Sequence, residues 1–183
     1  MTTSLDLRSS AARRDQMTRR RLDRIVPSIM AEEDIDCWIL VSREYAEDPV
    51  AQTMLPATWM SSRRRTILVF IAGPEGVRRH AVTRYEVDGL FPSAWDPEAD
   101  GDQWQALARL VGDARPERIA VSKSQNFAHG DGLTASEHAD LLGALGPQLA
   151  ERVVSGEALA VRWLQTRLPE ERPVLERACS TAH

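Results

Sequence analysis

One loop-rich segment brings together the side chains of this sequence that are best suited to bind an anionic ligand. It follows a buried apolar strand and carries Arg43, Tyr45 and Asp48, and later the neighbouring pair Arg63 and Arg64. Arginine binds carboxylates through its planar guanidinium fork, and α/β proteins commonly build sites at the ends of their strands. A structural role is equally compatible with the sequence, because Arg43 and Asp48 could pair to order the loop. The segment therefore predicts either a functional site at a strand end or an ordered loop.

A second cluster of titratable residues lies further along the chain, in the segment HGDGLTASEH. His129, Asp131, Glu137 and His138 are close in sequence and could form a set of metal ligands. However, Thr134 followed by Glu137 three residues later is the capping-box pattern that starts a helix. We therefore predict a loop followed by a capped helix, and keep His129 and Asp131 as candidate substrate or intersubunit contacts.

Motifs of other enzyme classes are absent from the sequence. There is no HExxH pattern, no Cys/His cluster with zinc spacing, no GxSxG nucleophile motif and no GxxxxGK[ST] phosphate loop. Cys37 and Cys179 are far apart, and Cys37 lies in the apolar run DCWILV, where a small buried side chain is expected. We assign no catalytic residue and no metal ligand to this chain.

Composition and charge argue against several further classes of protein. The formal net charge is -4, which disfavours general nucleic-acid binding despite basic clusters at 13–21 and 63–65. The apolar share of 43% is ordinary for a globular domain that can bury a core. No stretch has the ~20 apolar residues of a membrane span, and the N-terminus lacks the apolar region of a secretory signal. We expect a soluble, cytoplasmic protein that binds neither membranes nor nucleic acid.

The elements that must position these side chains alternate between strands and helices. Five strands are predicted, at 36–42, 64–72, 77–85, 117–122 and 150–156. Five helices are predicted from apolar periodicity, at 13–33, 103–114, 134–146, 157–168 and from Glu170 onward. The GPEG turn joins the second and third strands into a hairpin, and Pro27 is expected to kink or break the first helix. This order predicts an α/β fold with a mixed β-sheet flanked by helices.

Three regions are predicted along the chain. They are a disordered polar tail at 1–12, an α/β domain at 13–168, and a linker with the start of a further domain at 169–183. Pro169 and Pro173 mark the linker. The last helix carries no Gly or Asn stop signal, so the sequence pattern alone leaves open why the chain ends there.

The order of several segments resembles a known family. RRRLDRIVPSIMAEEDIDCWILVSREYAEDP is similar to the opening of the N-terminal domain of the creatinase, prolidase and aminopeptidase P family. RRRTILVF, RIAVSKSQNFAHGDGLTASEH and ALAVRWLQTRLPEE are similar to the next segments of Xaa-Pro aminopeptidase-like members. The resemblance runs from about Arg19 to the C-terminus. It implies a mixed-sheet α/β domain with a ribonuclease H-like motif.

The resemblance also implies a protein of two parts. In the family, this N-terminal domain precedes a pita-bread catalytic domain that binds two divalent metal ions, such as manganese or cobalt, through two Asp, one His and two Glu. In that layout, ALAVRWLQTRLPEERPVLERACSTAH resembles the connecting helix and the first helix of the catalytic domain, so the chain is expected to end just inside that domain. All five ligands would lie beyond His183, so this chain alone is expected to hold no cofactor and to be inactive. The expected partners are its own catalytic domain, a second copy in a homodimer and, for the full protein, proline-containing peptides.

A role for an arginine is implied by the same resemblance. In creatinase-like members, an Arg just before the second strand contributes to the active site of a neighbouring subunit, and the nearest matches here are Arg63 and Arg64. Two alternatives stay open: the N-terminal domain of a metal-free creatinase-like hydrolase, and a stand-alone dimerising interaction module. A nucleic-acid-binding α/β domain is a third, which the acidic balance disfavours.

Overall fold

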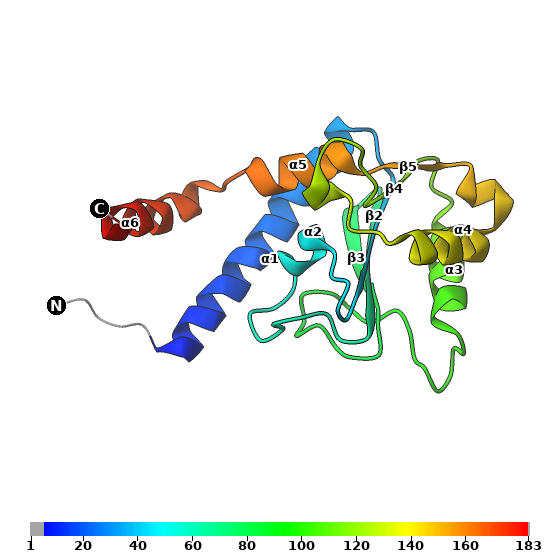
Figure 1. The fold of residues 1–183 in the computed structure, drawn as a ribbon, viewed down its shortest axis with the longest axis horizontal. Helices are drawn as coiled ribbons and strands as arrows, with labels where there is room; N and C mark the ends of the chain where they lie inside the picture. Colours follow the sequence, from blue (N-terminus) through cyan, green and yellow to red (C-terminus); the bar gives the residue numbers. More distant parts are fainter. Residues whose placement is uncertain (1–5, 183) are drawn as a thin grey trace.

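The computed structural model describes residues 6–182 and is built on a mixed sheet of five strands (Figure 1). The strands are β1 Cys37–Arg43, β2 Arg65–Gly73, β3 Gly76–Val82, β4 Ile119–Val121 and β5 Val153–Ser155. Their order across the sheet is β3-β2-β1-β4-β5. β2 is antiparallel to both β1 and β3, whereas β1, β4 and β5 run parallel. The predicted α/β fold with a mixed sheet flanked by helices is confirmed.

Helices cover both faces of this sheet. They are α1 Leu7–Glu32, α2 Pro49–Gln52, α3 Gln103–Ala114, α4 Ala135–Ala150, α5 Glu157–Gln165 and α6 Arg172–Ala182, with short 3-10 helices η1 at Ala128–Gly130 and η2 at Pro169–Glu171. α1, α2 and α5 pack on one face, and α3 and α4 on the other. The sheet therefore separates two hydrophobic cores. Figure 1 shows α6 extending away from the sheet.

The central strand β1 shows why the chain forms two cores. Its side chains alternate, with Trp38 and Leu40 in the α1/α5 core and Cys37, Ile39 and Val41 in the α3/α4 core. Each of these is at most 1% exposed, and a strand that is apolar on both sides needs cover on both. Burial raises the pKa of the Cys37 thiol to about 12, so this residue is the buried hydrophobe that the sequence predicts.

The first helix begins earlier than predicted. α1 starts at Leu7, so that residues 7–12 are helical where a polar tail was expected, and residues 1–5 of that tail lie outside the described part of the chain. The Asp6 carboxylate caps the helix by accepting hydrogen bonds from two backbone N–H groups of its first turn, at 2.7 and 3.2 Å. The helix also continues through Pro27 without the predicted break.

Caps and a glycine explain the other differences from the predicted elements. α2 lies within the expected loop after β1, where Asp48 caps the helix and Pro49 occupies its first turn. In α4, Gly146 has φ 72° and interrupts the helical conformation at the predicted stop, but a further helical turn follows. This turn shortens the predicted fifth strand to Val153–Ser155. The third strand ends at Val82, before the predicted limit.

Candidate functional site

The ends of three adjacent strands, β1, β2 and β3, lie together on one side of the sheet, beside an open groove. β1 ends at Arg43, β2 begins directly opposite at Arg65, and β3 ends nearby because it runs parallel to β1. The groove has a volume of about 660 Å³ and is lined by Arg43, Glu44, Tyr45, Arg64, Arg65, Arg84, Tyr85 and Gln103. We call it the arginine groove. It brings together Arg43, Tyr45 and Arg64 of the predicted site residues and is therefore the candidate functional site.

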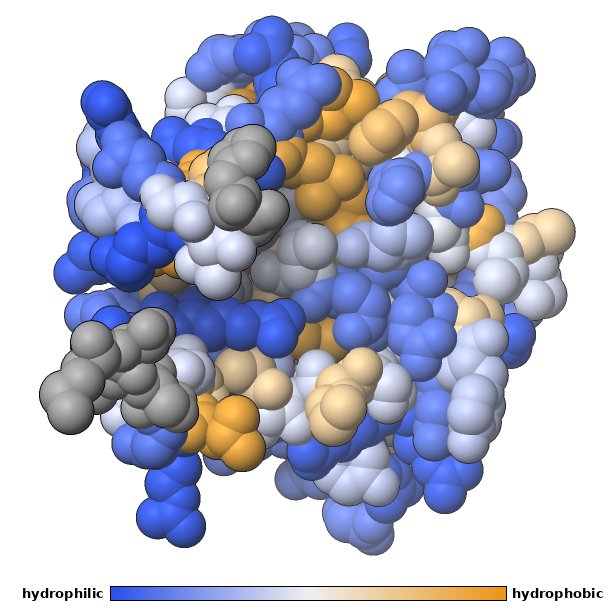
Figure 2. Space-filling model, turned by 60° about the vertical axis from the view of Figure 1, so that its left-hand side comes forward, coloured by the Kyte–Doolittle hydropathy of each residue, from blue (hydrophilic) through white to orange (hydrophobic). Residues whose placement is uncertain are grey.

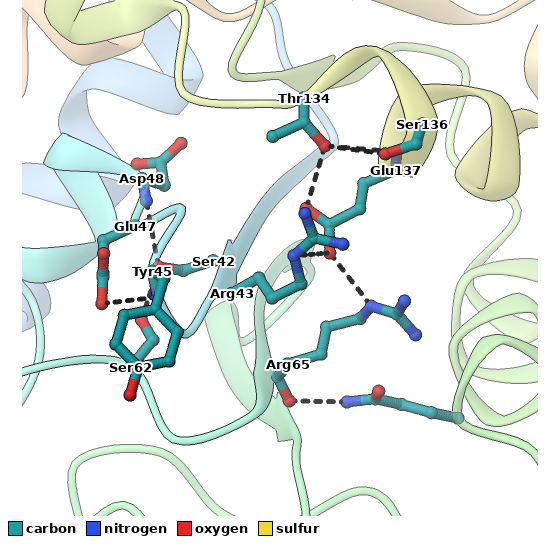
Figure 3. A network of polar contacts seen from close by, with 11 residues as sticks. Ser42, Arg43, Tyr45, Glu47, Asp48, Ser62, Arg65, Thr134, Ser136 and Glu137 are labelled. Carbon is teal, nitrogen blue, oxygen red and sulfur yellow. Dashed lines mark hydrogen bonds and ion pairs between the residues drawn. The ribbon is translucent and has the colours of Figure 1, made fainter.

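A buried carboxylate from α4 holds two of these arginines. The Glu137 side chain is 1% exposed, and its Oε1 lies 3.1 Å from Arg65 Nε and 3.9 Å from Arg43 Nε (Figure 3). The predicted capping box is only half formed. The Glu137 N–H donates to the Thr134 hydroxyl at 3.4 Å, but its carboxylate points to the arginines instead of the Thr134 backbone. Pairing with cations stabilises a carboxylate that is removed from water.

The start of α3 fixes Arg65 from another side. The guanidinium carbon lies 4.7 Å from the ring centroid of Trp104, a distance typical of a cation–π contact. The Gln103 side-chain amide donates hydrogen bonds to the backbone oxygens of Arg65 and Val82, at 3.0 and 2.7 Å. These contacts join the first turn of α3 to the beginning of β2 and the end of β3. Arg65 is therefore the most constrained cation of the arginine groove.

Two exposed residues of the groove have a left-handed backbone conformation. Tyr45 has φ 67° and Arg64 has φ 56°, and their segments are adjacent because the Glu44 N–H donates to the Arg64 carbonyl at 2.7 Å. This conformation is uncommon for residues other than glycine, asparagine and aspartate, and such positions cluster at functional sites. Tyr45 is 92% exposed, so burial of its ring does not explain the conformation. The strained backbone presents a phenol and a guanidinium to solvent at the groove.

The second arginine suggested by the resemblance, Arg63, lies beside the groove. Its guanidinium carbon is 4.7 Å from the ring centroid of Trp59 and 5.9 Å from that of Tyr85. Arg63 and Arg64 both precede β2, and of the two only Arg64 lines the groove.

Asp48 is buried and orders the loop that follows β1. Its Oδ1 caps α2 by accepting two backbone N–H hydrogen bonds at 2.9 and 2.8 Å, and its own N–H donates to Ser42 Oγ at 3.0 Å. Burial raises the pKa of the Asp48 carboxyl above its ordinary value of 3.8. The suggested pairing of Arg43 with Asp48 does not form, because Arg43 lies against Glu137. Figure 3 shows the two carboxylates in their separate places.

The second predicted cluster does not contribute to the arginine groove. His129 is exposed in η1, and its ring centroid lies 5.6 Å from that of Phe127. The Asp131 Oδ1 accepts a hydrogen bond from the Ser124 N–H at 3.0 Å and so closes the loop that follows β4. Neither residue lines the groove, and Asp131 has a clear role in ordering its own loop.

No metal centre is found in the described part of the chain. Within residues 6–182, no three His, Cys, Asp or Glu side chains are grouped so that they could hold a metal ion. These residues therefore do not fit the dinuclear centre that the family resemblance implies. Over the same range, no helix combines the length and the apolar character needed to cross a bilayer.

The arginine groove is cationic although the chain as a whole is acidic. Four arginines and one carboxylate, that of Glu44, line it, and the buried Glu137 carboxylate lies beside the lining against Arg65 and Arg43. Across residues 6–182, no carboxylate lies within 4.0 Å of a side-chain nitrogen of Arg64 or Arg84. The formal net charge of the whole chain is -4. Positive charge concentrated in a groove attracts anions and raises their local concentration.

Arg65, Arg84 and Glu137 were not predicted as site residues. A signal for Arg84 exists in the hairpin, because the register that pairs Ile67 with Val82 leads toward Arg65 and Arg84 when it is extended past the strand ends. Glu137 lies 72 positions from Arg65, and no local pattern links the two. Its role becomes visible only when α4 is packed on the sheet.

Comparisons with known proteins give a likeness of fold. No protein-family model matches the sequence, and no curated protein matches it either. Among solved structures, the chain is similar to a Xaa-Pro dipeptidase from Bacillus anthracis, with a TM-score of 0.52 and 16% sequence identity. The match covers 89% of this chain and 39% of that chain, so this chain spans well under half the length of the dipeptidase. At this identity the match establishes a shared fold.

Proposed function

We propose that this chain is the non-catalytic N-terminal domain of a Xaa-Pro peptidase related to the creatinase, prolidase and aminopeptidase P family. The observation that carries the proposal is the fold likeness to a Xaa-Pro dipeptidase, which includes most of this chain but less than half of that enzyme. In this role the domain supports a homodimer of a cytoplasmic enzyme and shapes the substrate entrance of its catalytic domain.

The arginine groove gives this role a chemical basis. Peptide substrates end in a carboxylate, which a guanidinium fork can bind through two parallel hydrogen bonds. Arg64 is exposed and Arg43 is 45% exposed, so both can reach a ligand. Because Glu137 and Trp104 hold Arg65 in place, the groove has a fixed position on the sheet edge. These features support a contact between the groove and substrate at the entrance of an active site.

Catalysis belongs, in this proposal, to a further domain of a longer protein. Two divalent metal ions, such as manganese or cobalt, would be held there by two Asp, one His and two Glu and would activate the attacking water. Residues 6–182 provide no such group of ligands. The 183-residue chain is accordingly expected to have no peptidase activity by itself.

The reading frame after the His183 codon provides the first test. We expect an open frame that encodes the five ligands, and a purified full-length protein that cleaves Xaa-Pro dipeptides in the presence of Mn²⁺. An open frame without these ligands would favour a metal-free creatinase-like relative. A stop codon at that point would contradict the proposal and favour a stand-alone dimerising module, whose self-association sedimentation analysis would then measure.

Substitution of Arg64 in such a full-length enzyme tests the role of the groove. Arg64→Ala is expected to raise KM about tenfold with kcat little changed, because a contact made equally in the ground and transition states is lost. Arg13→Ala is the control, since Arg13 is exposed on α1. An unchanged KM for both Arg64→Ala and Arg63→Ala would remove these two arginines from the substrate entrance.

A further inference from the structure

The arginine groove has more cationic groups than its own carboxylates can pair with. We propose that it binds an acidic peptide segment that carries at least two carboxylates. The binding of a multivalent anion is based on the groove itself, whereas the choice of a peptide as the carrier rests on the proposed function. The proposal thereby specifies a substrate or partner class for the groove: peptides with neighbouring Asp or Glu residues.

Many hydrogen-bond donors of the groove arginines are left without an acceptor. Arg65 uses its Nε for Glu137, and no acceptor among residues 6–182 takes a hydrogen bond from its terminal nitrogens. The side chains of Arg43, Arg64 and Arg84 likewise donate no hydrogen bond to an acceptor in that range, although Arg43 Nε lies 3.9 Å from the carboxylate of Glu137. Each guanidinium offers five N–H donors, so one ligand carboxylate would use only part of this capacity. Two or more carboxylates match the groove better than one.

Several of these cations are already held in position before a ligand arrives. Glu137 is 1% exposed and holds two arginines at the groove, and the Trp104 ring supports Arg65 from the side. A cation that is already fixed loses little conformational entropy on binding, which improves affinity. The left-handed backbone of Arg64 fixes where its side chain leaves the chain, while its guanidinium stays exposed. The groove therefore presents Arg65 and, at longer range, Arg43 at defined positions, with Arg64 and Arg84 exposed beside them.

The shape of the groove and its aromatic residues favour a peptide. Tyr45 is 92% exposed and Tyr85 is 39% exposed, and both line the groove. Exposed phenol rings give a peptide apolar contact together with a hydrogen-bonding hydroxyl group. The volume of about 660 Å³ lies within the ~300–1,000 Å³ typical of ligand pockets. A short peptide segment fits these dimensions better than a single small anion does.

Titration calorimetry on the 183-residue chain tests the proposal. The probes are the capped peptide Ac-EPE-NH2, its neutral analogue Ac-QPQ-NH2, and inorganic tripolyphosphate. We expect the acidic peptide to bind about tenfold or more tightly than the neutral one, and to weaken as ionic strength rises from about 0.05 to 0.3 M. Equal affinity for the two peptides would overturn the proposal. Binding of tripolyphosphate without binding of the acidic peptide would also overturn it, since the groove would then be a phosphate site.

Charge-matched variants locate the binding site. The double variant Arg43→Gln/Arg84→Gln is expected to lose at least about tenfold in affinity for the acidic peptide. The control Arg13→Gln/Arg14→Gln removes the same charge from the exposed face of α1 and is expected to bind normally. An equal loss in both variants would overturn the proposal by showing non-specific attraction. Arg84→Gln alone, at an exposed position, is expected to lose affinity too, which makes the test independent of whether the double variant folds.

The acidic-peptide site and the proposed function can fail separately. Binding of the acidic peptide by a protein whose full-length form cleaves no Xaa-Pro peptide would contradict the proposed function and leave the acidic-peptide site intact. Cleavage of Xaa-Pro peptides by a full-length protein whose groove binds the acidic and neutral peptides equally would support the proposed function and contradict the acidic-peptide site.

Discussion

At the scale of the residue, Glu137 orders part of the arginine groove. It accepts one close contact from Arg65 and a longer one from Arg43, so one negative charge lies between two positive ones. Half of the positive charge that it gathers therefore stays uncompensated and faces solvent. Arg64 and Arg84 have no carboxylate within 4.0 Å among residues 6–182 and add two further positive charges, so the groove is basic although the chain is acidic.

Replacing this carboxylate is expected to destabilise the domain. Glu137→Gln should lower the free energy of unfolding by about 2 kcal/mol, because a buried charge-assisted hydrogen bond is lost while the partial exposure of Arg65 limits the penalty. Urea denaturation measures this difference. Glu44→Gln is the matched control in the same groove and is expected to change stability by less than about 0.5 kcal/mol. Equal effects of the two substitutions would contradict the role assigned to Glu137.

Asp48 is expected to make stability depend on pH. Its folded-state pKa lies above the ordinary value of 3.8, so the folded protein binds the proton more tightly than the unfolded chain does. The stability contributed by protonated Asp48 is present below that ordinary pKa and is lost as pH rises through the folded value. Asp48→Asn keeps a helix-capping side chain and removes the titration. Wild type should therefore gain stability relative to this variant as the pH is lowered from about 7 to 4, in thermal unfolding experiments.

At the scale of the element, the sequence predicts the buried strands β1 and β2 better than the starts of α1 and α2. β1 and β2 are runs of apolar residues that need a hydrophobic core on both faces of the sheet. Such a run can be recognised directly in the sequence. The starts of α1 and α2 are each set by a single capping carboxylate, that of Asp6 or Asp48. Many other polar residues in the sequence could cap a helix equally well, so the pattern does not single these two out. These two helix starts are therefore harder to predict than the buried strands, whereas α3, α4 and α5 begin within one residue of the prediction.

The arginine groove could be predicted only in part, for a related reason. Arg43, Tyr45 and Arg64 follow or precede apolar strands, so their position at a strand end can be read locally. Arg84 and Glu137 reach the groove through pairings between distant segments, and such pairings are set by register and helix packing. The capping-box pattern at Glu137 also suggested a local role that its burial against two arginines overrides.

Packing between the loop after β4 and the start of α2 gives a prediction at this scale. A Cβ atom on Gly132 would lie 2.5 Å from Asp48 Oδ2 and 2.9 Å from its Cα, so Gly132→Ala must displace the loop or α2. We expect a loss of about 2 kcal/mol in the free energy of unfolding, measured by urea denaturation. Gly143→Ala in α4 is the control, because nothing lies within 4 Å of its added methyl group. That variant should gain about 0.5–1 kcal/mol, and a gain at both positions would contradict the close packing.

At the scale of the whole molecule, α6 is joined to the body mainly through η2. Ion pairs link Arg21 to Glu171 at 2.8 Å and Arg24 to Glu170 at 2.7 Å, whereas the side chains described for α6 are exposed. Figure 2, which turns the α1 and α6 side of the molecule forward, shows hydrophobic side chains at the surface between hydrophilic ones. Val174 and Leu175 are 53% and 46% exposed. The described side chains of α6 are therefore left largely uncovered by the rest of residues 6–182.

Hydrogen exchange should separate these parts of the 183-residue chain. Amides of 172–181 are expected to exchange within minutes, because few buried contacts oppose local opening there. Amides of 37–41 and 67–71 should exchange only on global unfolding, since they lie in the sheet between two cores. Mass spectrometry of peptic fragments measures both rates. Equal protection of α6 and β1 would show that α6 is packed far more firmly than its exposure indicates.

Because three strand ends meet at the arginine groove, its strand residues and its loop residues can evolve at different rates. Hydrogen-bonded register fixes Arg43 and Arg65, whereas the connections 44–64 and 83–102 supply the remaining lining residues short of α3. Connections on a surface tolerate exchange and changes of length far better than paired strands do. Substitutions in these two connections can therefore change ligand preference while Arg43 and Arg65 are kept. A library for directed evolution would accordingly vary residues 44–47, 60–64 and 83–86 and keep the residues of the strands unchanged.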